Sequence, residues 1–158
     1  MKYLLILLLG FNIAQADLIV KYGAEIPKKD EGLGASKALF LSYQSLLNRL
    51  FIYQYETGFW ADNAGSGRKS SFLTGPSIGV NVEAGYFYAQ ALSGPAIISA
   101  TDSLLGGHLQ FNNDVSFGIK DLKTSNTFGI DYKHISSAGL ASPNAGRDFI
   151  LIKVGIGI

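Results

Sequence analysis

The sequence contains no cysteine, carries almost balanced charge and has only two histidines, and each shortage excludes a class of protein. Without cysteine the 158-residue chain is not a disulfide-stapled miniprotein, so burial and backbone pairing must hold its fold. The formal net charge of +1 argues against a nucleic-acid partner. Because the two histidines lack metal-ligand spacing, we expect neither a zinc site nor a cofactor.

The chain also lacks an apolar run long enough to cross a bilayer as a helix. The longest candidate, Tyr3 to Ile13, is well short of the ~20 residues that a spanning helix needs. It follows Lys2 and precedes Ala14-Gln15-Ala16, which is the order of a signal peptide with a small-residue cleavage site. We therefore expect residues 1–16 to be a signal peptide and residues 17–158 to form the mature domain, with an N-terminal membrane helix as the weaker alternative.

What the chain does have is 47% hydrophobic residues and 19 glycines. Apolar composition in an exported chain without spanning helices is typical of a membrane β-barrel, and it also fits a small lipocalin-like binder. Alternation with period two supports strands. It is clearest over residues 107–120 and 51–59, and it predicts further strands near 18–26, 37–47, 70–80, 83–92, 126–136 and 147–158.

The eight predicted strands are joined by connections of alternating length. Those after the first, third, fifth and seventh strands are long, namely PKKDEGLGAS, ADNAGSGRK, SGPAIISATDSLLGG and SAGLASPNAG. Those after the second and fourth are short, LNR and NVE, and the sixth, KDLKTS, is intermediate. Short periplasmic turns and longer external loops are expected of an outer-membrane barrel. The sequence thus predicts an all-β fold, an eight-stranded antiparallel transmembrane β-barrel with periplasmic termini.

The polar face of these strands decides between a membrane barrel and a soluble one. A soluble barrel buries its apolar face, so its polar face meets water; here a membrane barrel would instead enclose the polar face and turn the apolar face to lipid. A small interior can hold such charges only as a paired network. The residues concerned are Lys21, Glu25, Gln54, Glu56, Asp114, Lys120, Asp131 and Lys133. The polar face of residues 107–120 also includes His108, for which we expect a hydrogen-bond role in the lumen.

Three polar residues fall on the face that this interpretation turns to lipid. His134 and Ser136 share a face with Phe128, Ile130 and Tyr132, whereas Asp131 and Lys133 lie opposite and should point inward. In the last strand Asp148 lies with Ile150, Ile152, Val154, Ile156 and Ile158, opposite Arg147, Phe149, Leu151 and Lys153. Polar groups in lipid are costly, so these three side chains need a reason.

Serine, imidazole and carboxylate are the parts of a nucleophilic triad. His134 and Ser136 are ~6.7 Å apart at Cα along a strand, and Asp148 starts the adjacent antiparallel strand. The chain leaves the strand at Ser137 and Gly139, whose N–H groups are candidates for an oxyanion hole. The alternative is an interfacial cluster that hydrogen-bonds lipid headgroups.

The segments HISSAG and PNAGRD, within residues 128–152, resemble the lipid A 3-O-deacylase family of outer-membrane enzymes. That family has a His-x-Ser-Asn-x-Gly type motif and an acidic residue after a Pro/Asn/Gly-containing turn. The resemblance implies hydrolysis of an ester-linked acyl chain of lipid A, with His134 as base, Ser136 as nucleophile and Asp148 as acidic partner. Two residues depart from the pattern: Ser137 replaces an asparagine, and Asp148 replaces a glutamate.

The expected partners are therefore lipid A or lipopolysaccharide as substrate and the surrounding outer-membrane lipid, while a homodimer is left open. Four basic residues in the predicted external loops are either phosphate contacts or ordinary solvated charges: Lys28, Lys29, Arg68 and Lys69. Two other functions remain open. One is a non-enzymatic structural or adhesive barrel, and the other is a barrel acyltransferase that uses the same serine chemistry with a different acceptor.

Overall fold

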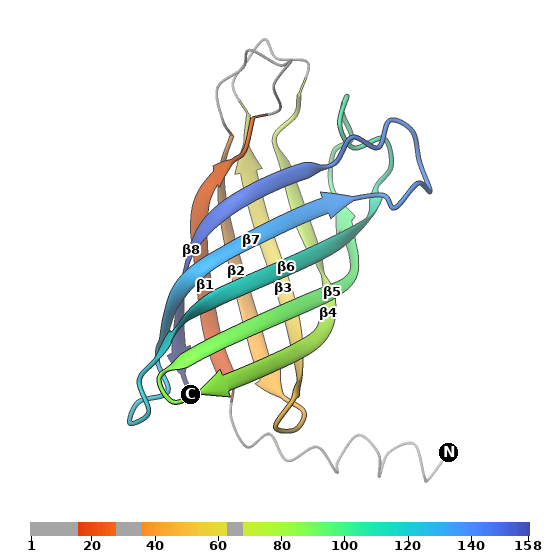
Figure 1. Ribbon diagram of the computed structural model, residues 1–158. Coiled ribbons are helices and arrows are strands. Elements are labelled where there is room, and N and C mark those ends of the chain that lie inside the picture. Colours follow the sequence, from red (N-terminus) through yellow and green to blue (C-terminus); the bar gives the residue numbers. More distant parts are fainter. Residues whose placement is uncertain (1–15, 28–35, 63–67) are drawn as a thin grey trace, which may run out of the picture.

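The computed structural model describes residues 16–27, 36–62 and 68–158, and they form a closed antiparallel barrel (Figure 1). Each strand pairs with the next in sequence, and β8 pairs with β1 to close the sheet. The strands are β1 (Ala16–Glu25), β2 (Lys37–Leu46), β3 (Phe51–Ala61), β4 (Ser71–Ala84), β5 (Phe87–Ile98), β6 (Leu109–Lys120), β7 (Thr127–Ser136) and β8 (Arg147–Gly157). The eight-stranded barrel predicted from the sequence is confirmed. Of the predicted signal peptide, residues 1–15 lie outside the described residues, and Ala16 begins β1.

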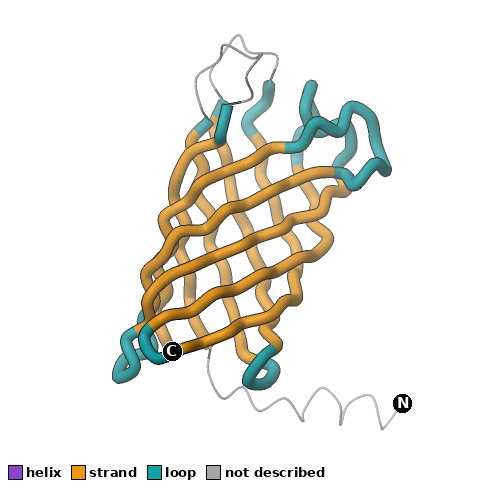
Figure 2. Tube along the Cα trace, in the orientation of Figure 1, coloured by secondary structure: helices purple, strands orange, loops and turns teal. Residues whose placement is uncertain are grey.

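The two ends of the barrel differ in the length of their connections (Figure 2). The segments 99–108 and 137–146 lie at one end, which we call the loop end. The turns after β2, β4 and β6 lie at the other, which we call the turn end. The N–H of Ile158 donates to the carbonyl O of Ala16 at 2.9 Å, so the C-terminus is at the turn end.

Successive residues along the strands alternate between a buried inner wall and an exposed outer wall. Lys133 and Lys153 point inward with at most 1% exposure, whereas Ile152 points outward. Both placements agree with the faces predicted from the sequence. An apolar outer wall around a charged interior reverses the arrangement of a soluble protein and matches a barrel that spans a bilayer.

Helices contribute nothing to this arrangement across the described ranges. Within them, no helix is long and apolar enough to span a membrane.

The middle of the lumen is filled by a network of charged side chains. Lys21 Nζ lies 3.0 to 3.1 Å from carboxylate oxygens of Glu56, Asp114 and Asp131. Lys133 Nζ lies 2.5 Å from Glu56 Oε1 and 2.6 Å from Asp114 Oδ1. All five side chains are buried. Buried charges require partners, and this network supplies the pairing that the sequence demanded.

Between this network and the loop end lies an apolar cluster. Phe149 packs against Phe40 and Trp60, with ring centroids 6.0 and 6.1 Å apart. The cluster reaches Ile135, which points inward between the outward residues His134 and Ser136. Its members are Ala38, Phe40, Trp60, Leu73, Ala96, Ile98, Leu104, Leu105, Ile135, Phe149 and Leu151. The cluster therefore packs against the inside of the wall that carries the predicted site.

The β4–β5 hairpin differs from the sequence prediction. We expected a turn at residues 81–83, but β4 continues to Ala84 and the chain turns at Gly85, which has φ of 61°. A positive φ suits glycine in a tight turn. Asn81 is not a turn residue, because its side chain is buried in the lumen and hydrogen-bonds Gln90 and Glu83. In a barrel with a polar lumen, an inward-facing polar residue within a strand resembles a turn residue in sequence.

The long connection predicted from Ser93 is also too long. β5 continues through Pro95 to Ile98. In the β4–β5 ladder, Thr74 pairs with Ile97 and Ile78 pairs with Ser93. The stretches between these two pairs contain Pro76 and Pro95. Proline has no N–H to donate and weakens a ladder, but it does not end these strands.

His108 is not part of the lumen network, so that expectation is wrong. β6 begins at Leu109, and His108 precedes it as an exposed residue. Its Nδ1 lies 2.8 Å from the carbonyl O of Ile98. The carbonyl O of His108 still accepts the N–H of Ile98 at 2.9 Å, so the backbone pairing with β5 reaches the histidine, but its side chain is exposed at the loop end.

Candidate active site

The predicted site residues lie on the outer wall, near the loop end, where β7 and β8 run side by side (Figure 1). Asp131, Lys133 and Ile135 of β7 are buried, and the residues between them point outward. His134 and Ser136 are therefore on the outer wall, as the sequence predicted. Asp148 is the direct cross-strand partner of His134.

His134 and Asp148 are joined by a hydrogen bond. The distance from Nδ1 of His134 to Oδ1 of Asp148 is 2.7 Å, and the two side chains are 35% and 22% exposed. Directly opposite residues on neighbouring strands have their side chains on the same face within contact distance. With Nδ1 held by the carboxylate, Nε2 is the ring nitrogen left to accept a proton.

The same carboxylate oxygen has a second donor. Tyr132, two residues before His134 on the same face, donates its phenolic hydroxyl to Asp148 Oδ1 at 2.5 Å. The strand alternation predicts that Tyr132 shares this face, but it indicates no role for the side chain. The sequence shows only that Tyr132 is two residues from His134. Whether Tyr132 lies next to Asp148 depends on the register between β7 and β8, which the sequence does not give.

Ser136 shares the face of His134, but no hydrogen bond joins their side chains. Its side chain is half-buried, and within the described ranges its hydroxyl has no hydrogen-bond partner. The structure thus joins two of the three predicted triad members and places the third two residues away along the same strand. Catalytic hydrogen bonds in substrate-free sites are often long and tighten only when substrate binds.

The predicted oxyanion residues lie at the start of the segment 137–146. The N–H of Ser137 donates to Asn144 Oδ1 at 2.7 Å, and the Ser137 hydroxyl donates to the carbonyl O of Ala141 at 3.1 Å. Ser137 therefore holds the segment together, with a side chain that is buried. Asn144 was missed from the sequence, where it read only as a turn residue.

Gly139 differs from Ser137 in keeping its N–H available. Ala138 and Gly139 have φ values of 50° and 83°, and a left-handed conformation at both residues makes the chain bend sharply after β7. In the part of the chain that the structure describes, the N–H of Gly139 has no hydrogen-bond partner. A free N–H close to a candidate nucleophile is the element that an oxyanion hole requires.

The imidazole of His134 rests on the backbone of Gly146. A Cβ at residue 146 would lie 2.8 Å from Cε1 of the ring and 3.4 Å from Nε2. The β7–β8 register pairs Ile135 with Arg147, so one further step places Gly146 opposite Ser136. The missing side chain therefore leaves the space in which the ring reaches along β7 toward the serine. No sequence pattern indicated this contact, because glycine near a turn is common.

Replacing Gly146 by alanine should lower the rate of the serine reaction more than it lowers stability. The new methyl group would occupy the place of the imidazole, so we expect a loss of at least about tenfold in kcat with KM little changed, as for a misplaced catalytic group. Gly146 also has φ of 73°, which strains any replacement. The matched control is Gly85→Ala, since Gly85 has φ of 61° and a Cβ added there would meet nothing within 4 Å.

Both variants should unfold at similar temperatures, and only the first should react slowly with a fluorophosphonate serine probe. Equal labelling rates for the two variants would show that Gly146 makes no room for the ring.

Arg147 fixes the start of β8 from inside the barrel. Its guanidinium lies 3.1 Å from Glu25 and 2.9 Å from Asp62, and it also contacts Asp102. The arginine is buried, so these carboxylates supply the partners that a buried cation needs. Because Asp148 is the next residue, the anchor also limits the movement of the candidate acid.

Asp102 lies in the segment 99–108, outside the strands. Burial raises its pKa, but the hydrogen bonds from the N–H of Leu104, from Arg147 and from the N–H of Lys69 outweigh burial and hold the pKa below its ordinary value. The carboxylate therefore stays charged as the partner of Arg147. This contact connects the segment 99–108 to the first residue of β8.

The basic residues of the loops have different environments. Lys28 and Lys29 lie outside the described residues. Arg68 contacts Glu25, with Nη1 and Oε2 3.0 Å apart, so part of its charge is already paired. Lys69 is exposed. The expected contacts with lipid A phosphates remain predictions.

A polar pair extends the site along the outer wall. Asn113 of β6 is the cross-strand partner of His134, on the side away from Asp148. Ser93 donates its hydroxyl to Asn113 Oδ1 at 2.7 Å. The imidazole therefore has an uncharged amide on one side and a carboxylate on the other.

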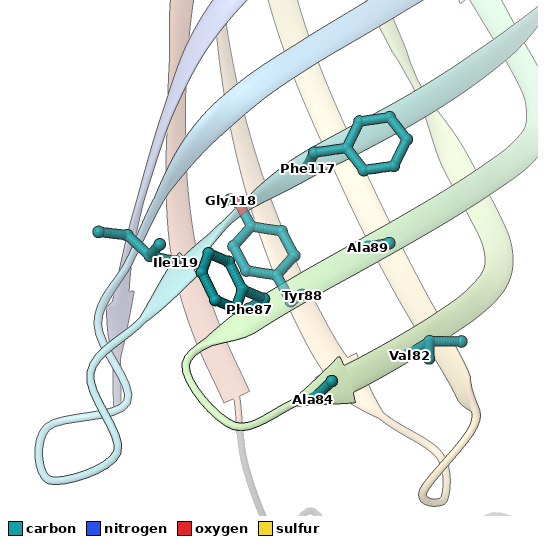
Figure 3. A pocket seen from close by; sticks show the side chains of 8 residues that line it. All are labelled: Val82, Ala84, Phe87, Tyr88, Ala89, Phe117, Gly118 and Ile119. Carbon is teal, nitrogen blue, oxygen red and sulfur yellow. The ribbon is translucent and has the colours of Figure 1, made fainter.

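A hollow of about 440 Å³ lies elsewhere on the barrel, at the turn end between β5 and β6 (Figure 3). Its lining includes Phe87, Phe117 and Ile119, with Tyr88 as its one ionisable side chain. It contains no serine, histidine or carboxylate. This hollow has the chemistry of a surface that lipid covers, and it is distant from the His134–Asp148 pair.

Comparison with known sequences finds one matching family and a curated relative. The model of the family described as Lipid A 3-O-deacylase (PagL) matches residues 34–157. A curated relative, Lipid A deacylase PagL of Bordetella bronchiseptica, is 36% identical over 67 residues, which are 40% of this chain. The matched region spans only 37% of the length of that relative.

Three solved structures share the fold. The crystal structure of the outer membrane enzyme PagL aligns with a TM-score of 0.63 and 22% identity, covering 90% of this chain and 99% of that one. A designed transmembrane β-barrel gives 0.61 and 8%, covering 91% and 95%. Ail, an outer membrane protein of Yersinia pestis, gives 0.53 and 12%, covering 90% and 99%. At these identities the likeness shows the fold alone.

Proposed function

This chain belongs to the lipid A 3-O-deacylase family, and we infer from that membership that it is an outer-membrane esterase which hydrolyses the ester-linked acyl chain at the 3-position of lipid A. The match spans the β7–β8 hairpin with its candidate site. The structural observation that supports the residue roles is the hydrogen bond between His134 and Asp148, on the outer wall and beside Ser136. An orienting carboxylate and a base next to a serine are what serine-based ester hydrolysis requires.

In the proposed reaction, Ser136 is the nucleophile and His134 the general base. The Ser136 oxygen attacks the ester carbonyl carbon while Nε2 of His134 takes the hydroxyl proton. The tetrahedral intermediate then collapses, and the sugar oxygen leaves with the proton that His134 returns. An acyl chain stays bound to Ser136. Water attacks this acyl-enzyme in the same way and releases a free fatty acid.

Asp148 and the backbone after β7 support the charges that develop. Asp148 holds Nδ1 of His134, so it keeps the ring in the tautomer that presents Nε2 and stabilises the imidazolium. We assign the oxyanion to the N–H groups of Gly139 and Ser137. Gly139 supports this role directly, because its N–H is free within the described chain. Ser137 must first exchange its hydrogen bond with Asn144 for one with the substrate.

The position of the site suits a lipid substrate. With the termini on the periplasmic side, the loop end lies at the outer leaflet, which is where lipid A resides. Ser136 is at the last position of β7, close to that end, and it faces away from the lumen. Lipid A then reaches the serine by diffusing within the membrane, and the released fatty acid leaves by the same route.

The proposal is tested by the lipid A of a host that expresses the protein. Mass spectra should show the loss of one hydroxyacyl chain compared with cells that carry an empty vector. A gain of one acyl mass would instead assign a transferase. An unchanged spectrum from cells with a heat-modifiable, correctly folded barrel would refute the deacylase and favour a structural barrel.

A further inference from the structure

The carboxylate of Asp148 is shared between two donors from one strand. Oδ1 accepts from Nδ1 of His134 at 2.7 Å and from the hydroxyl of Tyr132 at 2.5 Å. Because both donors bind the same oxygen, the position of the carboxylate is fixed by both. A structural role alone does not require a tyrosine here, since the neighbouring outward positions of β7 are held by Ile130 and Phe128.

We propose that Tyr132 is a positioning residue of the Asp148–His134 pair, an inference that rests on the proposed function. Asp148 lies on the outer wall, where surrounding lipid leaves few water molecules to satisfy a carboxylate. A phenolic hydroxyl supplies a donor that remains in place when the membrane excludes water. It also fixes the side chain of Asp148, so that the imidazole finds its partner in one orientation.

The phenol also moderates the charge that the imidazole experiences. A donated hydrogen bond withdraws negative charge from Oδ1, so the carboxylate holds a proton on the ring less strongly. Loss of the phenol would concentrate charge on that oxygen and favour the imidazolium. Since the imidazole must be neutral to act as a base, the rise of activity with pH should then begin at a higher pH.

Among the described residues, the neighbours of the pair on the adjoining strands add no further charge on the outer wall. On the β6 side the neighbour of His134 is the uncharged Asn113. Lys133 and Arg147, adjacent in sequence to His134 and Asp148, are buried in the lumen on the other side of the sheet. On the β1 side the contact with Asp148 is between the N–H of Ile26 and the Asp148 backbone carbonyl.

The test compares Tyr132→Phe with Tyr55→Phe in the purified barrel, using lipid A in detergent micelles. Tyr55 is a second exposed tyrosine of the outer wall, and its hydroxyl hydrogen-bonds Thr74 at 3.0 Å, far from the catalytic pair. Tyr132→Phe should lower kcat roughly tenfold, the order expected for one hydrogen bond to a charged group, and leave KM within about twofold. Its rate profile should shift to higher pH. Tyr55→Phe should match the unmodified protein.

A second measurement does not depend on activity. The chain has two histidines, so NMR titration of the imidazole signals can follow His134 with His108 as an internal reference. In Tyr132→Phe the titration midpoint of His134 should rise while that of His108 stays fixed. This result in a protein without deacylase activity would sustain the positioning contact and reject the proposed function. If the His134 midpoint does not move in Tyr132→Phe, and the kinetics of that variant match those of Tyr55→Phe, the proposed role of Tyr132 is wrong.

Discussion

Replacing Ser136 by alanine should abolish deacylation, and adding His134→Ala should then lower the rate little further. Both residues act in the same step, attack on the ester carbonyl, so the loss of either removes the advantage of both. In other serine hydrolases the loss of such a residue costs ~10⁶ in kcat, and the multiple variant costs about the same. The assay is release of fatty acid from purified lipid A by the folded barrel.

Ser45→Ala is the matched control for this pair. Ser45 lies on β2 toward the turn end, on the same outer wall, and it takes no part in the site. That variant should retain full activity. If the losses for Ser136→Ala and His134→Ala instead multiply in the double variant, the two residues serve different steps and the proposed mechanism is wrong.

Replacing Asp148 by asparagine should keep the barrel folded and lower turnover by orders of magnitude, ~10⁴-fold in the best-measured triad. An amide can donate to Nδ1 and thereby hold the ring in the tautomer that has no free Nε2. It also cannot stabilise the imidazolium. The measurement is kcat on lipid A, with heat modifiability as the check on folding.

Asp148→Glu should be the milder change, because members of the family carry glutamate at the matching position. The longer side chain must move away from Tyr132 to reach His134, so some activity should be lost. Near-normal turnover of Asp148→Asn would mean that the acid lies elsewhere or that the site is a dyad of Ser136 and His134.

The faces of the strands could be predicted from the sequence because lipid and lumen impose opposite chemistry on alternate residues. In β7, the inward pair Asp131 and Lys133 fixed the outward direction of His134. The same rule fails at the β4–β5 hairpin, where Asn81 predicts a turn but lies within β4. A polar lumen accepts asparagine as readily as a turn does, so composition alone cannot separate the two.

The contacts within the site needed information that periodicity does not contain. Strand register decides whether Asp148 lies beside His134 or one pair away, and the ten residues 137–146 leave that register open. Tyr132, Asn144 and Gly146 acquire their contacts only once the register is set. Each one was visible in the sequence as an ordinary wall or turn residue.

The ion-pair partners of the lumen residues likewise could not be predicted from the sequence. That Lys21 needed buried anions followed from its place on the polar face. That these anions are Glu56, Asp114 and Asp131, from three other strands, depends on how the sheet closes. Closure brings together residues far apart along the chain, and no local pattern records it.

The filled interior has a consequence for the cell that carries this protein. In the described part of the barrel, paired charges occupy the middle of the lumen and Trp60, Phe149 and their neighbours pack above them. A solute therefore finds no aqueous path along the axis. Cells that produce the barrel in quantity should remodel their surface lipid without becoming leaky to small antibiotics, so any change in drug susceptibility would report on altered lipid packing and not on a pore.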